Sequence, residues 1–176
     1  RKEYTGADPL KIRLEKGVHQ IVGYFDEGYH LKTLIVACSH IAFVGEGKDH
    51  TTISGGFEVD NQRNVTFEEL TITAPRGSGL ELSGSETNVD MLKCAVKECG
   101  GTGMFVIEGA TVTATQCEFM ENGVNGVVCN SANTKTRLND CKIYQNGRDG
   151  LVALDHAAVV DLHGTRTEIH SNKSHG

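Results

Sequence analysis

The sequence predicts an all-β fold, a parallel β-helix built as a solenoid of about seven coils. The first observation is an internal repeat, because Cys94, Cys117 and Cys141 recur at intervals of 23 and 24 residues. Glycines at positions 79, 103, 126 and 150 recur in step with them. The second observation is that short triplets with apolar outer residues return with the same period. A fixed period in this range is typical of repeats that stack on one another.

The first family of triplets predicts one strand in each coil. Because side chains alternate across a strand, the outer two residues face the core and the middle residue faces outward. The seven copies are residues 12–14, 34–36, 57–59, 80–82, 104–106, 127–129 and 151–153.

Two further families of triplets predict the remaining strands. The second family is residues 41–43, 65–67, 89–91, 112–114 and 136–138, and the third is residues 70–72, 94–96, 117–119 and 141–143. Each coil, of roughly 22–26 residues, then holds about three short strands, and equivalent strands run parallel about 4.8 Å apart. Helix is a poor alternative, because apolar residues at i and i+2 dominate.

The turn after the third strand carries an asparagine in three successive coils, Asn122, Asn146 and Asn172. Asparagine tolerates the left-handed conformation of a sharp bend, and stacked amides can hydrogen-bond along the axis. We expect an asparagine ladder in this turn, with these residues in the left-handed conformation.

The six cysteines allow three disulfides or six thiols. Three of them hold the same repeat position, as interchangeable small core residues do, which favours thiols. Reduced thiols favour a cytoplasmic protein. The alternative is an extracellular protein from which a signal peptide has been removed.

The composition excludes two classes of partner. A formal charge of −6 argues against nucleic acid, because phosphate contacts need a concentrated Lys and Arg surface. No apolar run is long enough to span a membrane. We expect a single β-helix domain over residues 1–176, and a fragment of a longer β-helix or multidomain protein, because the sequence stops in mid-coil.

Residues 41–176 resemble the repeats called carbohydrate-binding and sugar-hydrolase repeats, of the right-handed parallel β-helix superfamily that includes pectate-lyase-like enzymes. The segments 11–19 and 43–55 are similar to the first coils of that superfamily. The resemblance, with the usual hand of parallel crossovers, implies a right-handed helix. It leaves function open, because the superfamily holds polysaccharide lyases and epimerases together with non-catalytic repeats of signalling and ubiquitin-ligase receptor proteins.

The middle residues of the first triplets form an outward file that begins with Arg13 and Ile35. Its candidate binding surface is Glu58, Glu81, Phe105, Val128 and Val152. Three consecutive apolar residues facing away from a core can form a docking stripe, or a turn or a further segment of the protein can cover Phe105 and Val128. The stacked pair Glu58 and Glu81 could also bind a cation or flank a glycosidic bond, although stacked surface acids are common.

The alternative candidate is a catalytic cluster of Asp90, Lys93, Arg137 and Asp140. Lyases of the superfamily hold calcium against a uronate with acids and remove the C5 proton with Arg or Lys. No motif of a lyase or epimerase matches these four residues, and surface ion pairing is the favoured explanation of them. Calcium is expected only under this alternative, and the spacing of the histidines predicts no metal site.

The sequence therefore favours a non-catalytic binding scaffold that recognises a protein or a glycan on an outward strand face. The alternative is a lyase, C5-epimerase or glycoside hydrolase acting on an acidic polysaccharide.

Overall fold

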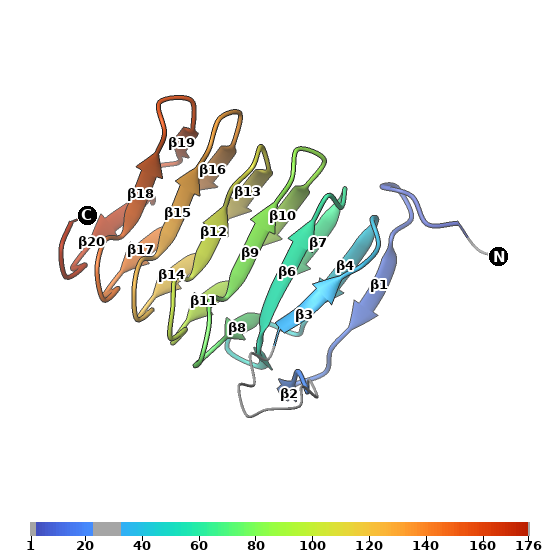
Figure 1. Cartoon of the computed structure of the whole chain (residues 1–176). Coiled ribbons are helices and arrows are strands. Elements are labelled where there is room, and N and C mark those ends of the chain that lie inside the picture. Colours follow the sequence, from blue (N-terminus) through green and yellow to red (C-terminus); the bar gives the residue numbers. More distant parts are fainter. Residues whose placement is uncertain (1–2, 23–32, 176) are drawn as a thin grey trace, which may run out of the picture.

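The computed structural model describes residues 3–22 and 33–175, and the described chain forms a solenoid of three parallel sheets (Figure 1). The coils follow one another in sequence order along the axis (Figure 1). Sheet A contains β1 (Leu10–Arg13), β4 (Ile41–Val44), β7 (Val65–Glu68), β10 (Asn88–Leu92), β13 (Thr111–Thr115), β16 (Lys135–Asn139) and β19 (Val159–His163). The described residues contain no helix, and therefore none that could cross a membrane.

Sheets B and C complete each coil. Sheet B contains β2 (Gly17–Gln20), β5 (Thr51–Ser54), β8 (Thr71–Thr73), β11 (Ala95–Lys97), β14 (Glu118–Met120), β17 (Lys142–Tyr144) and β20 (Glu168–His170). Sheet C contains β3 (Thr33–Val36), β6 (Gly56–Asp60), β9 (Leu80–Ser83), β12 (Met104–Val106), β15 (Val127–Asn130) and β18 (Leu151–Leu154). The predicted all-β solenoid with three strands in each coil is confirmed.

The assignment of residues 12–14 to the first family of triplets is wrong. Leu10 pairs with Ile41 and Ile12 with Phe43, so this segment is the first strand of sheet A. Arg13 accordingly lies beside Val44 and does not begin the outward file of sheet C. An apolar triplet shows that a strand has a buried face, but all three sheets have such strands, so the triplet alone does not identify its sheet.

The core is built from inward residues that stack on their equivalents one coil away. In sheet A, the stacked residues Val65, Val89 and Val112 are at most 1 % exposed. Near the N-terminal end the rings of Phe43 and Phe67 stack with centroids 5.3 Å apart, and Phe57 meets each of them edge-on. Apolar side chains therefore fill the space between the three sheets.

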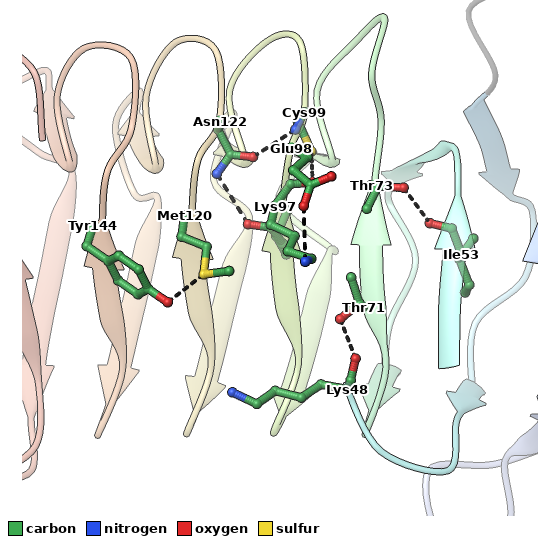
Figure 2. A network of polar contacts seen from close by, with 11 residues as sticks. Lys48, Ile53, Thr71, Thr73, Lys97, Glu98, Cys99, Met120, Asn122 and Tyr144 are labelled. Atoms are coloured by element: carbon green, nitrogen blue, oxygen red, sulfur yellow. Dashed lines mark hydrogen bonds and ion pairs between the residues drawn. The ribbon is translucent and has the colours of Figure 1, made fainter. Parts of the chain in front are cut away.

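The asparagine ladder is confirmed, and its hydrogen bonds run from coil to coil. Asn122 Nδ2 donates to Asn146 Oδ1 at 2.9 Å, and Asn146 Nδ2 donates to Asn172 Oδ1 at 2.9 Å. At the N-terminal end, Asn122 Oδ1 accepts from the backbone N–H of Cys99 at 3.2 Å (Figure 2). Cys99 is thus the residue on which the ladder ends.

The expectation that these asparagines adopt the left-handed conformation is wrong. The preceding residues adopt it, namely Glu98, Glu121, Gln145 and Ser171, with φ between 54 and 55°. The bend at the preceding residue turns each asparagine inward, where Asn122 and Asn146 are 1 % and 2 % exposed. Asparagine is therefore used here for its buried amide and not for its tolerance of positive φ.

We expect Asn146→Ala to lower the free energy of unfolding by about 3 kcal/mol, because it leaves buried partners above and below without a hydrogen bond. The lost bonds involve Phe119 O, Asn172 Oδ1 and the N–H of Asn122. Urea unfolding followed by circular dichroism measures the change. The control Asn88→Ala removes an amide that makes no side-chain hydrogen bond within the described residues, and should cost less than about 0.5 kcal/mol. Equal losses in the two variants would contradict the ladder's contribution.

All six cysteines are free thiols, and all except Cys38 are buried. Cys94, Cys117 and Cys141 stack in one inward file and are at most 1 % exposed. Burial raises the pKa of the Cys99 thiol to about 11. The hydrogen bond with Cys141 lowers the pKa of the Cys117 thiol, but the hydrogen bond with Cys94 and burial outweigh it and raise that pKa to about 12. The Cys99 and Cys117 thiols therefore belong to the core and are protonated at neutral pH.

Titration of the native protein with a disulfide reagent at neutral pH should therefore detect one rapidly reacting thiol, that of Cys38. The denatured protein should show all six. The variant Cys38→Ser should lose the rapid phase, because buried, protonated thiols are poor nucleophiles. Several thiols reacting rapidly in the native state would contradict the buried stack.

Candidate functional site

A groove of about 580 Å³, here named the corner trough, runs along the edge where sheet A turns into sheet B. Residues 46–50 form one part of its lining, and the corner side chains Glu69, Lys93, Gln116 and Asp140 form another. Glu118, Lys142 and Arg166 also line it. The lining is therefore polar and carries both signs of charge.

The floor of the corner trough depends on a backbone bend repeated in four coils. Its corner residues all have positive φ, 53° at Glu69, 52° at Lys93, 54° at Gln116 and 51° at Asp140. The bend directs this side chain outward and the next one into the core, where Leu70, Cys94, Cys117 and Cys141 lie. Backbone hydrogen bonds continue through the bend, as from Lys93 N to Thr115 O at 2.9 Å. The left-handed conformation costs about 1 kcal/mol in a residue with a side chain, and these bonds offset it.

Two longer loops bound this floor. Only two residues separate the strands of sheets A and B at each of the four corners, whereas six residues, 45–50, separate β4 from β5. Four residues, 164–167, separate β19 from β20 at the other end. A Cβ at Gly45 would lie 2.4 Å from Glu69 O, and Gly47 has a φ of 114°, so both glycines are needed where the first loop leaves the corner.

The cations of the corner trough form ion pairs with carboxylates. Lys93 Nζ lies 3.0 Å from Glu69 Oε1, and Arg166 Nη2 lies 3.2 Å from Asp140 Oδ2. Lys142 Nζ lies 3.4 Å from Glu168 Oε2. Adjacent coils bring these groups together, because each partner comes from the next coil along the axis.

Lys48 fastens the loop 45–50 to the outer face of sheet B. Its ammonium lies 2.7 Å from Glu118 Oε1. Its carbonyl oxygen accepts a hydrogen bond from Thr71 Oγ1 at 2.7 Å (Figure 2). Thr71 and Ala95 lie on the outer face of sheet B, yet they are buried, at 2 % and 4 % exposure. The loop thus extends from the second coil toward β14.

Two groups near the corner trough offer further contacts. The amide of Gln116 makes no side-chain hydrogen bond within the described residues, so its donors and acceptor are available. On sheet B, the rings of Tyr144 and His170 stack with centroids 5.4 Å apart and an angle of 9° between their planes. The Tyr144 hydroxyl donates to Met120 Sδ (Figure 2).

The structure divides the candidate catalytic residues between two surfaces. Lys93 and Asp140 lie in the corner trough, separated by the coil that carries Gln116. Asp90 and Arg137 lie on the outer face of sheet A, separated by Thr113. Arg137 Nη2 lies 3.3 Å from Asp161 Oδ2. The four residues are therefore not brought together around one point.

The pKa values of the two acids of this set are shifted in opposite directions. Hydrogen bonds from Arg166 hold the pKa of the Asp140 carboxyl below its usual value, so Asp140 is a carboxylate at neutral pH. Partial burial raises the pKa of Asp90, and its neighbours in the same file are Thr66 and Thr113. Among the described residues, no group of three His, Cys, Asp or Glu side chains is arranged to hold a metal ion.

The candidate binding residues do form one file on sheet C. Glu58 pairs with Glu81, and the file continues through Phe105, Val128 and Val152. The middle of its apolar part is covered, since Val128 is only 2 % exposed. This file therefore presents less apolar surface than its sequence indicates.

The sequence analysis missed the residues that wall the corner trough, Lys48, Glu118, Lys142 and Arg166. The available signal was the length of the connection between the strands of sheets A and B. Residues 45–50 and 164–167 are longer connections than the two-residue corners that lie between them. The segment Gly45-Glu-Gly47 begins the longest of these corners.

Comparison with known proteins supports the fold. A family model described as "Right handed beta helix region" matches residues 42–176. No curated protein matches the chain in sequence.

Three solved structures are similar to this chain. The ORF18 protein of Geobacillus virus E2 has a TM-score of 0.66 and 16% identity, over 94% of this chain and 34% of its own. A pectin methylesterase from Yersinia enterocolitica has a TM-score of 0.59 and 21% identity, over 80% of this chain and 51% of its own. The pectate lyase Pel9A has a TM-score of 0.65 and 14% identity, over 92% and 56%. The likeness concerns the fold alone, and the chain spans between about a third and just over half of each of these proteins.

The ion pair of Lys48 with Glu118 should hold the loop 45–50 in place. We expect Lys48→Met to speed amide hydrogen exchange in residues 46–50 about fivefold, which corresponds to the ~1 kcal/mol that a partly exposed ion pair contributes. The control Arg137→Met removes a partly exposed pair with Asp161, at 3.3 Å, on the outer face of sheet A. Exchange in the loop that is the same in wild type and Lys48→Met would contradict this role of Lys48.

Proposed function

Because this chain belongs to the right-handed β-helix family, we propose that it is a non-catalytic glycan-binding scaffold whose ligand lies along the corner trough. One observation carries the proposal, an open groove whose floor is a straight file of polar side chains bounded by two projecting loops. Such a groove suits a linear chain that is open at both sides and held by hydrogen bonds.

The spacing of the floor supports a polymer of sugars. Glu69, Lys93, Gln116 and Asp140 come from adjacent coils, about 4.8 Å apart. This spacing is close to the length of one pyranose residue in an extended chain, so each coil can meet one sugar. Two of the similar structures bear names that refer to pectin and pectate, which are polysaccharides.

The contacts available suit hydroxyl groups. Carboxylates accept hydrogen bonds from sugar hydroxyls, and the free amide of Gln116 both donates and accepts. The methylene stems of the lysines supply apolar surface for the faces of the sugar rings. The stacked rings of Tyr144 and His170 lie on sheet B, next to the corner trough.

The ionisation of the groove supports binding without catalysis. A general acid at neutral pH needs a raised pKa, whereas Arg166 lowers the pKa of Asp140. Asp90, whose pKa burial raises, lies on sheet A outside the lining of the groove. The candidate acid and the candidate binding groove are thus on different surfaces.

The variant Gln116→Ala tests the site. We expect it to weaken binding of a glycan hexamer about fivefold, because one hydrogen-bonding side chain contributes about 1 kcal/mol. Calorimetry measures the affinity. The control Gln145→Ala has the same residue type at the equivalent left-handed bend between sheets B and C, outside the corner trough. Gln145→Ala should bind as the wild type does.

Two outcomes would contradict the proposal. Loss of partner capture in Phe105→Asp, with no effect of Gln116→Ala, would place binding on sheet C and favour a protein partner. Release of unsaturated or shortened products from a uronate panel, with or without calcium, would show catalysis and support the lyase, epimerase or hydrolase alternative.

A further inference from the structure

The charges in the corner trough determine which glycans it can accept. Its lining holds five carboxylates, those of Glu46, Asp49, Glu69, Glu118 and Asp140, against four cations. The side chains alone therefore leave the groove with an excess of negative charge.

All four cations are already engaged within the protein. Lys48 pairs with Glu118 at 2.7 Å, Lys93 with Glu69 at 3.0 Å, Arg166 with Asp140 at 3.2 Å and Lys142 with Glu168 at 3.4 Å. An anionic ligand would have to compete with these carboxylates for every cation. The groove thus offers an anion no unoccupied positive group among the described residues.

Two of the carboxylates in the lining are not paired with a cation of the described residues. Glu46 and Asp49, both on the loop 45–50, form no ion pair within the part of the chain that the structure describes, and both line the groove. A uronate chain brings one carboxylate with each sugar, and like charges at close range repel. A neutral glycan chain instead donates hydrogen bonds from its hydroxyl groups to these carboxylates, and no like charges are brought together.

Resting on the proposed glycan-binding function, we infer that the corner trough selects uncharged glycans and excludes polyuronates. The fold is shared with proteins named for pectin and pectate, but the paired cations and the two free carboxylates direct this groove toward a different class of polysaccharide. The selectivity comes from charge, and it should weaken as salt is added.

The test compares four neutral hexamers, cellohexaose, xylohexaose, mannohexaose and maltohexaose, with hexagalacturonate, by calorimetry at low salt. We expect at least one neutral hexamer to bind, and hexagalacturonate to bind at least tenfold more weakly or not at all. The double variant Glu46→Gln/Asp49→Asn should reduce that preference several-fold. The double variant Glu69→Gln/Glu118→Gln frees Lys93 and Lys48 and should tighten hexagalacturonate binding about tenfold.

A matched control, Glu108→Gln/Asp155→Asn, removes the same kinds of charge from residues outside the groove and should leave both affinities unchanged. Urea midpoints close to that of the wild type verify that each variant is folded. Binding of hexagalacturonate by the wild type as tightly as the best neutral hexamer overturns the charge selectivity and leaves the glycan-binding function standing. No binding of any hexamer overturns the proposed function, and the selectivity with it.

Discussion

The register between adjacent coils is the constraint on which the rest of this structure depends. Each strand pairs with its equivalents in the neighbouring coils, so an inward residue always meets the same position of the next repeat. A shift of one residue would turn every apolar side chain of that strand toward solvent. The register also explains the buried files, in which Leu70 and the cysteines that follow it occupy equivalent buried positions although their side chains differ. It requires each coil to bring the chain back one strand spacing further along the axis, and the left-handed corner residues recur at the same place in each turn.

Because the register fixes the inward positions of the strands, the differences between coils that shape the surface lie in the corners and the outward side chains. Between sheets A and B, four corners of two residues lie between a loop of six residues and a loop of four. The hollow is the consequence of that difference in length. A uniform solenoid would present a flat corner there, and this one presents a floor with a wall at each end. The position of the candidate site therefore follows from loop length, and its chemistry follows from outward side chains that the core does not constrain.

This separation decides what the sequence could predict. The strands and the stacked Asn122 and Asn146 were predictable, because burial imposes a strict pattern on inward positions. The sheet assignment of residues 12–14 was not, because one apolar triplet satisfies any of the three sheets. Of the candidate site residues, Lys93 and Asp140 were identified from their outward positions. Arg166 was missed, because its contact with Asp140 depends on the path of a loop, and no periodic pattern specifies that path.

The same stacking determines which charged groups meet at this corner. A solenoid places outward side chains of adjacent coils about 4.8 Å apart, so a pair of groups close enough to cooperate in a reaction arises easily. An acid that keeps its proton at neutral pH is harder to obtain, because a cation one coil away lowers its pKa, as Arg166 does for Asp140. Where acids and bases alternate along a corner, adjacent charges neutralise each other and leave hydrogen-bonding groups at regular intervals. Such a surface can match a polymer of similar repeat length.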